Sequence, residues 1–257
     1  MKKKNRITAL AGALLFIVGI VLLFITRGSA IIKDAAVKDT VFFALSLILT
    51  LVGLVVLIAG LLPERKPADT RTLALAAMFA ALCYIGFSFL RIDIPVGTEK
   101  TAFHLGNVFC VLGALFLGGM WGGAAGAVGM TIADLTTGYI TSAPKTFLLK
   151  LCIGLITGLV AHTVFQLNRR PLSKGKLTAA VALSSAAGMA FNVVADPVVG
   201  YFYKTYVLGV PQDAAALWAK IGAITTLVNA VIAVIAATVL YLALRPALKR
   251  TGMLKLG

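Results

Sequence analysis

Long apolar runs alternate with short polar segments along almost the whole chain. A helix that crosses a bilayer needs about 20 consecutive, mostly apolar residues. On that criterion the sequence predicts eight membrane spans, at residues 7–25, 41–62, 73–90, 101–121, 122–140, 146–167, 177–201 and 214–244. The pattern therefore predicts an all-α fold, a helical bundle that crosses the membrane several times.

The clearest break in this pattern lies at residues 61–70, with the sequence LLPERKPADT. It holds two prolines and four charged residues, and Asp69 or Thr70 is a candidate helix cap before the next apolar run. We expect the chain to divide there into residues 1–69, which form two leading transmembrane helices and a cytoplasmic linker, and residues 70–257, which form a core of six helices.

The overall composition agrees with a membrane protein. Hydrophobic residues make up 60% of the chain and the mean hydropathy is +0.99, which is too apolar for a soluble domain. The net charge of +15 does not indicate a nucleic-acid binder, because the basic residues lie in short clusters between the apolar runs. The predicted inner segments hold 15 Lys and Arg and the outer loops 7. The positive-inside rule therefore predicts a plasma-membrane protein with both termini in the cytoplasm.

The first residues, MKKKNR before an apolar run, also resemble a signal peptide. The run at residues 7–25 is longer than a typical h-region of about 7 to 15 residues. The only small-residue site, Gly28-Ser29-Ala30, directly follows Arg27. A retained helix is the favoured interpretation.

Polar residues inside and beside the apolar runs form the main candidate site. A charged side chain in hydrocarbon costs roughly 2.5–3.5 kcal/mol by insertion scales, so such residues usually face a bundle interior or a wet cavity. With the orientation above, these residues fall in the outer halves of their spans, and the inner halves hold little charge. This depth predicts a substrate cup that opens to the outside. Its candidate binding residues are Glu99, Lys100, His104, Asn107, Asp134, Lys150, Asn192, Asp196, Trp218 and Lys220.

Each of these features also has an ordinary structural explanation. Charges within a membrane commonly pair with one another, so the same residues fit structural ion pairs. The loop at residues 91–100, with Pro95 and Gly97, fits either a mobile flap over the cup or an inert connector. The outer aromatic residues between 201 and 218, Trp218 among them, fit a membrane belt or a stacking surface for a planar ligand.

Small residues recur at four-residue spacing in several spans. The span at residues 73–90 has two such pairs, Ala76 with Ala80 and Ala77 with Ala81. Small residues so placed form a smooth face on which another helix can approach closely. From the residues alone, this face fits packing within the bundle or docking of a partner. Two GxxxG pairs, at residues 122–126 and 154–158, are interpreted as packing contacts.

No set of catalytic or metal-binding residues emerges. The sequence has no Walker lysine loop, no HExxH and no GxSxG, and its two histidines, His104 and His162, fall at opposite membrane faces. Three cysteines lie singly within apolar runs, which indicates core packing rather than disulfides or a zinc site. We therefore expect no enzyme activity, no cofactor and no metal, and energy for uphill transport must come from a partner or a gradient.

The predicted core resembles the substrate-binding S component of energy-coupling factor (ECF) vitamin transporters, in the riboflavin-transporter-like family. The resemblance runs from about Thr70 to Leu244. It rests on the segments ALAAMFAAL, TAFHLGNVFCVLGALFLGG, the glycine-rich hairpin that leads to IADLTTGY, and APKTFLLKLCIGLITGLVAH. It implies a six-helix core that binds a micronutrient near the outer face, beneath a lid formed by the first outer loop.

The resemblance also implies partners. The family docks on a transmembrane coupling protein that sits on two cytoplasmic ATPases, and it is thought to topple in the membrane to deliver its cargo. Ala76, Ala77, Ala80 and Ala81 match the docking motif of that family. The two leading helices depart from the six-helix form. They could stabilise the subunit, contact the coupling protein or hinder toppling.

Two other functions compete with this interpretation. An autonomous secondary transporter or channel for a small polar solute would need intramembrane charges that extend into the inner half. In a membrane scaffold, the shared depth of the polar residues would be accidental. The leading interpretation is an S component that takes up a vitamin or a related heterocycle, such as a pyrimidine, a pyridoxine-like compound or a deazapurine precursor.

Overall fold

The computed structural model describes residues 3–29, 36–61, 69–97, 99–167 and 171–250 of the chain. The fold is mostly helical (85%). Four helical segments are long and apolar enough to cross a membrane: Thr70–Ser88, Ile140–Val164, Lys174–Val207 and Gln212–Arg250. The prediction of a helical membrane bundle is confirmed, whereas its division into two plus six helices stays a prediction.

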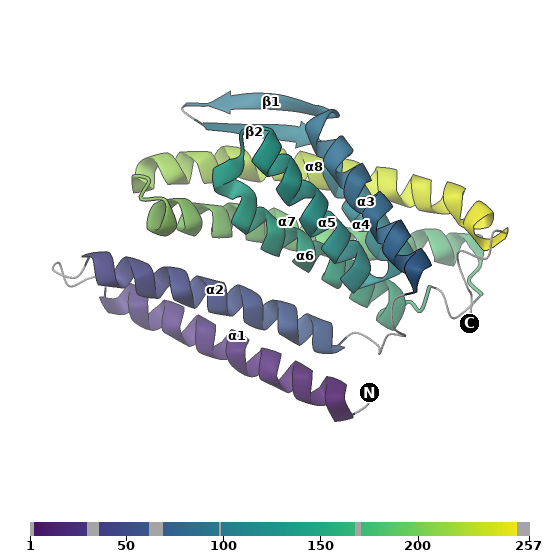
Figure 1. The fold of residues 1–257 in the computed structure, drawn as a ribbon, viewed down its shortest axis with the longest axis horizontal. Helices are drawn as coiled ribbons and strands as arrows, with labels where there is room; N and C mark the ends of the chain where they lie inside the picture. The colour runs from purple at the N-terminus through teal and green to yellow at the C-terminus, as the bar shows by residue number, and fades with distance from the viewer. Residues whose placement is uncertain (1–2, 30–35, 62–68, 98, 168–170, 251–257) are drawn as a thin grey trace. The chain divides into compact units, whose positions relative to one another are not determined.

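Eight α-helices and one two-stranded sheet lie along the described part of the chain (Figure 1). The α-helices are α1 (Lys3–Ser29), α2 (Ala36–Leu61), α3 (Thr70–Ser88), α4 (Gly106–Leu117), α5 (Gly119–Thr136), α6 (Ala143–Leu159), α7 (Lys174–Phe202) and α8 (Gln212–Arg250). The strands are β1 (Arg91–Val96) and β2 (Glu99–His104). Three short helical turns are η1 (Ile140–Ser142), η2 (Val160–Val164) and η3 (Tyr203–Val207).

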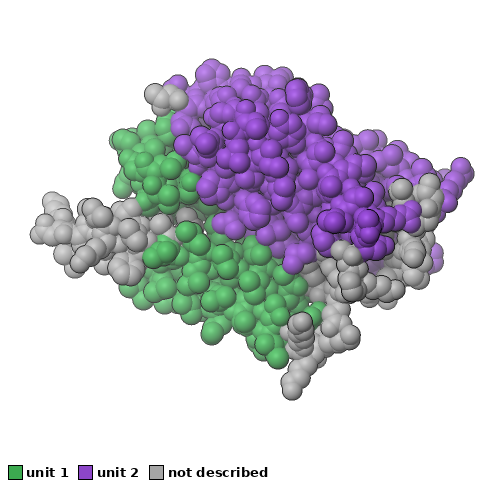
Figure 2. All heavy atoms as spheres, in the orientation of Figure 1, with its two compact units in different colours: residues 1–64, 197–220 green, residues 65–196, 221–257 purple. Residues whose placement is uncertain are grey.

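The chain divides into two compact units (Figure 2). The first comprises residues 1–64 and 197–220, and the second comprises residues 65–196 and 221–257. The segment 197–220 begins inside α7 and ends inside α8, so the connection between these helices belongs with α1 and α2. The division predicted from the sequence, into residues 1–69 and 70–257, stays a prediction.

In the first unit, α1 and α2 pack through glycines spaced seven residues apart on each helix. A Cβ atom added at Gly12 would overlap the backbone of Leu57, and one added at Gly60 would overlap the backbone of Ala9. Gly19 and Gly53 make the same kind of backbone contact. Small residues let two membrane helices approach closely enough for backbone contact. This glycine pattern was not recognised from the sequence.

The turn between α4 and α5 consists of one residue, Gly118, with φ 86° and ψ 164°. Residues with a side chain rarely adopt this backbone conformation, so glycine is required there. The sequence predicted a glycine-rich hairpin at residues 118–123, with one helix ending at Trp121 and the next beginning at Gly122. The structure has its turn within that range, three residues before the expected helix end, at Gly118. Hydropathy does not change across this apolar, glycine-rich sequence, so it gives no exact position for the turn.

The predicted packing role of the two GxxxG pairs is confirmed. A Cβ atom added at Gly122 would overlap the backbone of Ala114, so α4 and α5 touch at that point. Added Cβ atoms at Gly154 and Gly158 would overlap α5 in the same way. Helices α4, α5 and α6 therefore lie in backbone contact.

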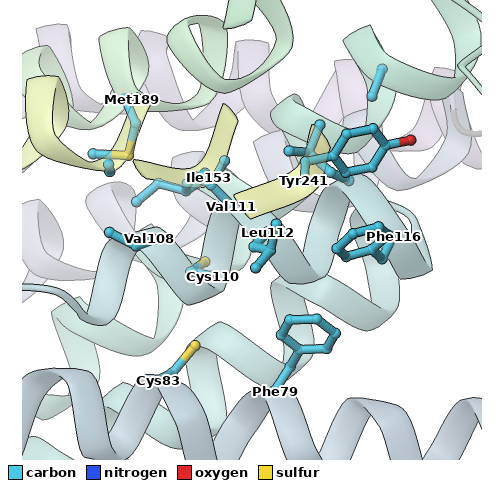
Figure 3. Close-up of a cluster of buried hydrophobic side chains, with 14 of the residues drawn as sticks. Phe79, Cys83, Val108, Cys110, Val111, Leu112, Phe116, Ile153, Met189 and Tyr241 are labelled. Atoms are coloured by element: carbon cyan, nitrogen blue, oxygen red, sulfur yellow. The ribbon is translucent and has the colours of Figure 1, made fainter. Parts of the chain in front are cut away.

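Buried apolar side chains from α3, α4, α5, α6, α7 and α8 fill the core of the second unit, and Figure 3 shows part of this cluster. The rings of Phe116 and Tyr241 stack with their centroids 4.6 Å apart. Cys83, Cys110 and Cys152 are free and buried, as the sequence predicted.

Residues 91–104 form a β-hairpin, which the sequence analysis did not predict. β1 and β2 are antiparallel, with Arg91 opposite His104 and Val96 opposite Glu99. The predicted helix start at Thr101 was therefore wrong, because α4 begins at Gly106. The alternation of polar and apolar residues in Arg-Ile-Asp-Ile, at the start of β1, is the period of a strand. The long apolar run that follows this segment led to residues 101–104 being assigned to the next helix.

Asp69 caps the start of α3, which confirms one of the two predicted caps. Its carboxylate accepts hydrogen bonds from the backbone N–H of Thr72 (2.9 Å) and from the Thr72 hydroxyl (2.6 Å). These bonds stabilise the ionised form and lower the pKa of Asp69. The cap thus gives α3 a defined start directly after the polar break.

Gly122→Ala should destabilise the chain, because its Cβ would overlap the backbone of Ala114. Overpacking of this kind costs about 1–3 kcal/mol, so thermal unfolding in detergent should show a lower Tm than that of the native chain. Gly222→Ala is the matched control, since an added Cβ there meets no described atom within 4 Å. Equal Tm values for the two variants would contradict the packing described here.

Candidate functional site

Several polar side chains are buried in the second unit, on helices that are otherwise apolar. Asn107 on α4 is 1% exposed, Asp134 on α5 is 2% exposed, Lys150 on α6 is 7% exposed and Asn192 on α7 is 1% exposed. Burying polar groups is costly unless they have partners, so these residues need a structural or a functional explanation. We call these four residues, together with His104, Lys145, Asp196, Thr226 and Asn229, the polar cluster.

The best-defined part of the polar cluster is an ion pair that joins three helices. The Lys145 ammonium on α6 donates to Asp196 Oδ1 on α7 at 2.8 Å. The Thr226 hydroxyl on α8 donates to Asp196 Oδ2 at 2.9 Å. Both oxygens of Asp196 are therefore bound. This confirms the alternative that some intramembrane charges pair with one another, with Lys145 as the partner of Asp196.

Lys150 lies beside this ion pair. Its charge interacts with the charges of Asp134, Lys145 and Asp196. Within the described residues, however, its ammonium makes no hydrogen bond and no ion pair. A buried ammonium with three unused donors is suited to bind an acceptor oxygen or nitrogen of a small molecule.

Four acceptor or amphoteric atoms of the polar cluster are also buried without a hydrogen-bond partner among the described residues. They are His104 Nδ1, Asn107 Oδ1, Asp134 Oδ2 and Asn192 Oδ1. Asp134 is bound by the Thr146 hydroxyl, which leaves Oδ2 unpaired. Most buried polar atoms in proteins are hydrogen-bonded. Unpaired atoms of this kind, beside an unpaired ammonium, are what a site for a polar ligand requires.

Helix geometry places the two asparagines beside these charges. Asn107 lies three residues before Cys110, whose thiol contacts the backbone oxygen of Lys150 at 3.7 Å. Asn192 lies four residues before Asp196, on the same face of α7. Residues three or four apart on a helix are neighbours on its surface. Among the predicted residues, the structure therefore brings Asp134, Lys150 and Asp196 together. It places Asn107 and Asn192 about one helical turn from residues that contact Lys150 or Lys145.

His104 lies on β2, outside the membrane-spanning helices, rather than within a helix as predicted. Its ring centroid is 4.7 Å from that of Phe87. Its backbone N–H donates to Asn229 Oδ1 on α8 at 3.0 Å. Burial, with a smaller contribution from the charge of Lys150, lowers the pKa of His104 to about 3. The imidazole is therefore neutral at physiological pH, and it can donate or accept a hydrogen bond.

The hairpin is held to the end of α5 by a set of contacts around Tyr139. The Tyr139 hydroxyl donates to Asp93 Oδ1 at 3.0 Å. The Lys100 ammonium donates to the backbone oxygen of Thr137 at 3.2 Å and to Asp93 Oδ2 at 3.3 Å. It also lies 4.7 Å from the centre of the Tyr139 ring. Burial and the bond to Asp93 raise the pKa of Tyr139, so its hydroxyl keeps its proton.

These contacts give Lys100 a structural role in the hairpin. Glu99 lies at the opposite end of β2 from His104, paired with Val96. The binding roles that the sequence assigned to Glu99 and Lys100 stay predictions.

Trp218 and Lys220 lie on the part of α8 that belongs to the first unit. The Lys204 ammonium is 4.2 Å from the centre of the Trp218 ring, a cation–π contact within that unit. Phe202 and Tyr206 lie close to Lys204 in the sequence, and their rings stack with their centroids 6.1 Å apart. A role for Trp218 and Lys220 in the cup stays a prediction.

The four predicted docking alanines do not share one environment. Ala76 is buried in the bundle, and Ala80 is half-buried where α3 meets Gly129 of α5. Ala77 and Ala81 are exposed on the opposite face of α3. Only Ala77 and Ala81 are accessible to a partner helix in this arrangement.

Sequence reasoning missed Tyr139, Thr226 and Asn229. Asn229 carried the same signal as Asn192, because it is an amide inside an apolar run. Thr226 carried no such signal, since threonine is common in membrane helices and usually bonds to its own helix.

Within the described residues, no group of three or more His, Cys, Asp or Glu side chains could hold a metal ion.

One comparison with known proteins gives a match. Residues 68–246 match the family model described as ECF-type riboflavin transporter, S component. The matched range begins just before the Asp69 cap and ends near the end of α8. No curated protein and no solved structure matches the chain.

Lys145→Met should destabilise the second unit, because it leaves the Asp196 carboxylate with only Thr226 as a partner. A lost hydrogen bond to a charged group costs about 1.5–3 kcal/mol, which should appear as a lower Tm in detergent. The double variant Lys145→Met with Asp196→Leu should recover part of that loss, because it also removes the carboxylate that the single variant leaves without its ion-pair partner. A double variant no more stable than the single one would show that the pair is not coupled.

Proposed function

The chain belongs to the family of S components of ECF-type riboflavin transporters, and from that premise we propose that it captures a vitamin or related heterocycle and delivers it with a separate ATPase module. Family membership makes it a substrate-binding subunit of a membrane transporter. The choice of ligand, the capture from the outside and the coupling to ATPases are parts of the proposal.

The observation that carries the proposal is the buried, partly unpaired polar cluster. Lys150 offers donors, while Asn107, Asp134 and Asn192 offer acceptors within the same group of helices. A ligand that carries both donors and acceptors would satisfy these atoms, as the edge of a nitrogen heterocycle does. The β1–β2 hairpin, which includes His104, would form the lid that the family places over its site.

The energy for uptake would come from partners. The chain has no ATP-binding motif, so we propose a transmembrane coupling protein and two cytoplasmic ATPases. The exposed alanines Ala77 and Ala81 on α3 would form the docking surface. The excess of basic residues in the predicted inner segments supports cytoplasmic termini.

An autonomous secondary transporter of a small polar solute is the second candidate. It would use the same polar cluster, with a proton or sodium gradient as its energy source. The hydrogen bonds of Asp196 argue against this candidate, because a carboxylate that is bound by both Lys145 and Thr226 is poorly placed to exchange protons.

Reconstitution into liposomes distinguishes the two candidates. The isolated chain should bind its ligand, identified by native mass spectrometry of the purified protein, but should transport it only with the coupling protein, the ATPases and ATP. Uptake by the chain alone, driven by a proton or sodium gradient, would establish the secondary transporter instead.

Two variants test the location of the site in the same assay. Lys150→Ala should weaken ligand binding while the chain stays folded. Asp196→Ala should also weaken it, and should in addition lower the Tm because it leaves Lys145 without its partner. Lys174→Ala, at an exposed position at the start of α7, is the control and should bind normally. Native affinity in both cluster variants would show that the ligand binds elsewhere.

Ala77→Leu combined with Ala81→Leu should abolish assembly with the coupling protein and leave ligand binding intact, because two larger side chains would fill the smooth face of α3. Co-purification with a tagged coupling protein measures assembly. The control is Ala179→Leu with Ala190→Leu, two exposed alanines of α7. Normal assembly of the α3 double variant would exclude this face as the docking surface.

A further inference from the structure

Asn229 binds the edge of β2 in the way that a neighbouring strand would. Its Oδ1 accepts from the backbone N–H of His104 at 3.0 Å, and its Nδ2 donates to the backbone oxygen of Ala102 at 2.9 Å. These two groups belong to alternate residues of β2, so they point to the same side of the strand. The side chain of Asn229 is buried, 4% exposed.

The edge of β2 needs such a partner because it lies against the buried polar cluster. Unpaired backbone groups are costly when they are removed from water. A carboxamide carries one acceptor and one donor on the same short side chain, which matches the N–H and C=O of a strand edge. Leucine offers neither group, and an ionised aspartate offers only acceptors.

Asn229 also connects the hairpin to the ion pair. It lies three residues after Thr226, whose hydroxyl binds Asp196, and the Asp196 carboxylate binds Lys145. Residues three apart share one face of a helix. One face of α8 thus holds both β2 and the centre of the polar cluster.

We propose that Asn229 is a positioning residue of the binding site: by pairing with β2 it holds His104 against the polar cluster. This inference rests on the proposed function, since it assigns a role in ligand binding to that cluster. In this arrangement the bonds to Asn229 keep β2 attached to α8. The contacts of Asp93 and Lys100 around Tyr139 are then the ones that break when the hairpin moves.

The test uses the full chain in detergent with three variants: Asn229→Leu, Asn229→Asp and, as control, Thr225→Val. Thr225 is a buried neighbour on α8 whose hydroxyl bonds only to Ile221 of its own helix. Hydrogen exchange of the β2 backbone amides is measured by mass spectrometry at pH 5 and pH 8, relative to the native chain at each pH. Riboflavin affinity is measured in the same samples from the quenching of its fluorescence.

Asn229→Leu should lower β2 protection roughly tenfold at both pH values, because it loses both bonds, and it should weaken riboflavin binding. Asn229→Asp should fall between the native chain and the leucine variant at pH 8, because an ionised carboxylate still accepts from the His104 N–H but cannot donate to the Ala102 carbonyl. At pH 5 its protection should lie at least as close to that of the native chain, because a protonated carboxyl group again pairs an O–H donor with a C=O acceptor. Thr225→Val should stay native in both measurements.

Three results would overturn the proposal. The first is native β2 protection in Asn229→Leu, and the second is protection in Asn229→Asp no greater than in Asn229→Leu at either pH. The third is lost protection with unchanged riboflavin affinity, because Asn229 would then be structural only. If the native chain does not bind riboflavin, that result counts against riboflavin as the substrate, and β2 protection in the Asn229 variants then decides whether Asn229 holds the hairpin.

Discussion

The second unit of this protein depends on how the Asp196 carboxylate is satisfied. A charge partly buried among apolar helices, as Asp196 is, needs close partners. Lys145 supplies the opposite charge from α6, and Thr226 supplies a hydrogen bond from α8. Since α7 carries Asp196 itself, one side chain fixes the relative positions of three helices. The same need for close partners determines where the other polar residues near Asp196 lie.

Close helix packing makes this polar centre possible. Glycines at α4–α5 and α5–α6 contacts bring the backbones together, so that short side chains such as Asn107 and Asp134 are fully enclosed. The ion pair then satisfies some of the enclosed groups and leaves others unpaired. In the proposed function, those unpaired groups are the ones that would bind the ligand.

The β-hairpin contributes backbone as well as side chains to this arrangement. Asn229 satisfies one edge of β2, and the contacts around Tyr139 hold the hairpin to the end of α5. The two attachments differ in chemistry. The Asn229 attachment is a buried pair of neutral hydrogen bonds. The Tyr139 attachment involves the partly exposed charges of Asp93 and Lys100. If the hairpin is the proposed lid, the partly exposed attachment is the one that would release first.

The sequence by itself determined the membrane class, the order of the helices and six members of the polar cluster, because hydropathy and the cost of buried charge act on each residue wherever its neighbours lie. It also carried the motifs of the family. Only the tertiary structure decided that Asp196 pairs with Lys145, that Asn229 binds β2 and that Gly118 alone forms the α4–α5 turn. These contacts join residues far apart in the chain, or depend on backbone angles within a uniformly apolar run. The periodicity of one segment does not say which side chains of another segment its residues contact.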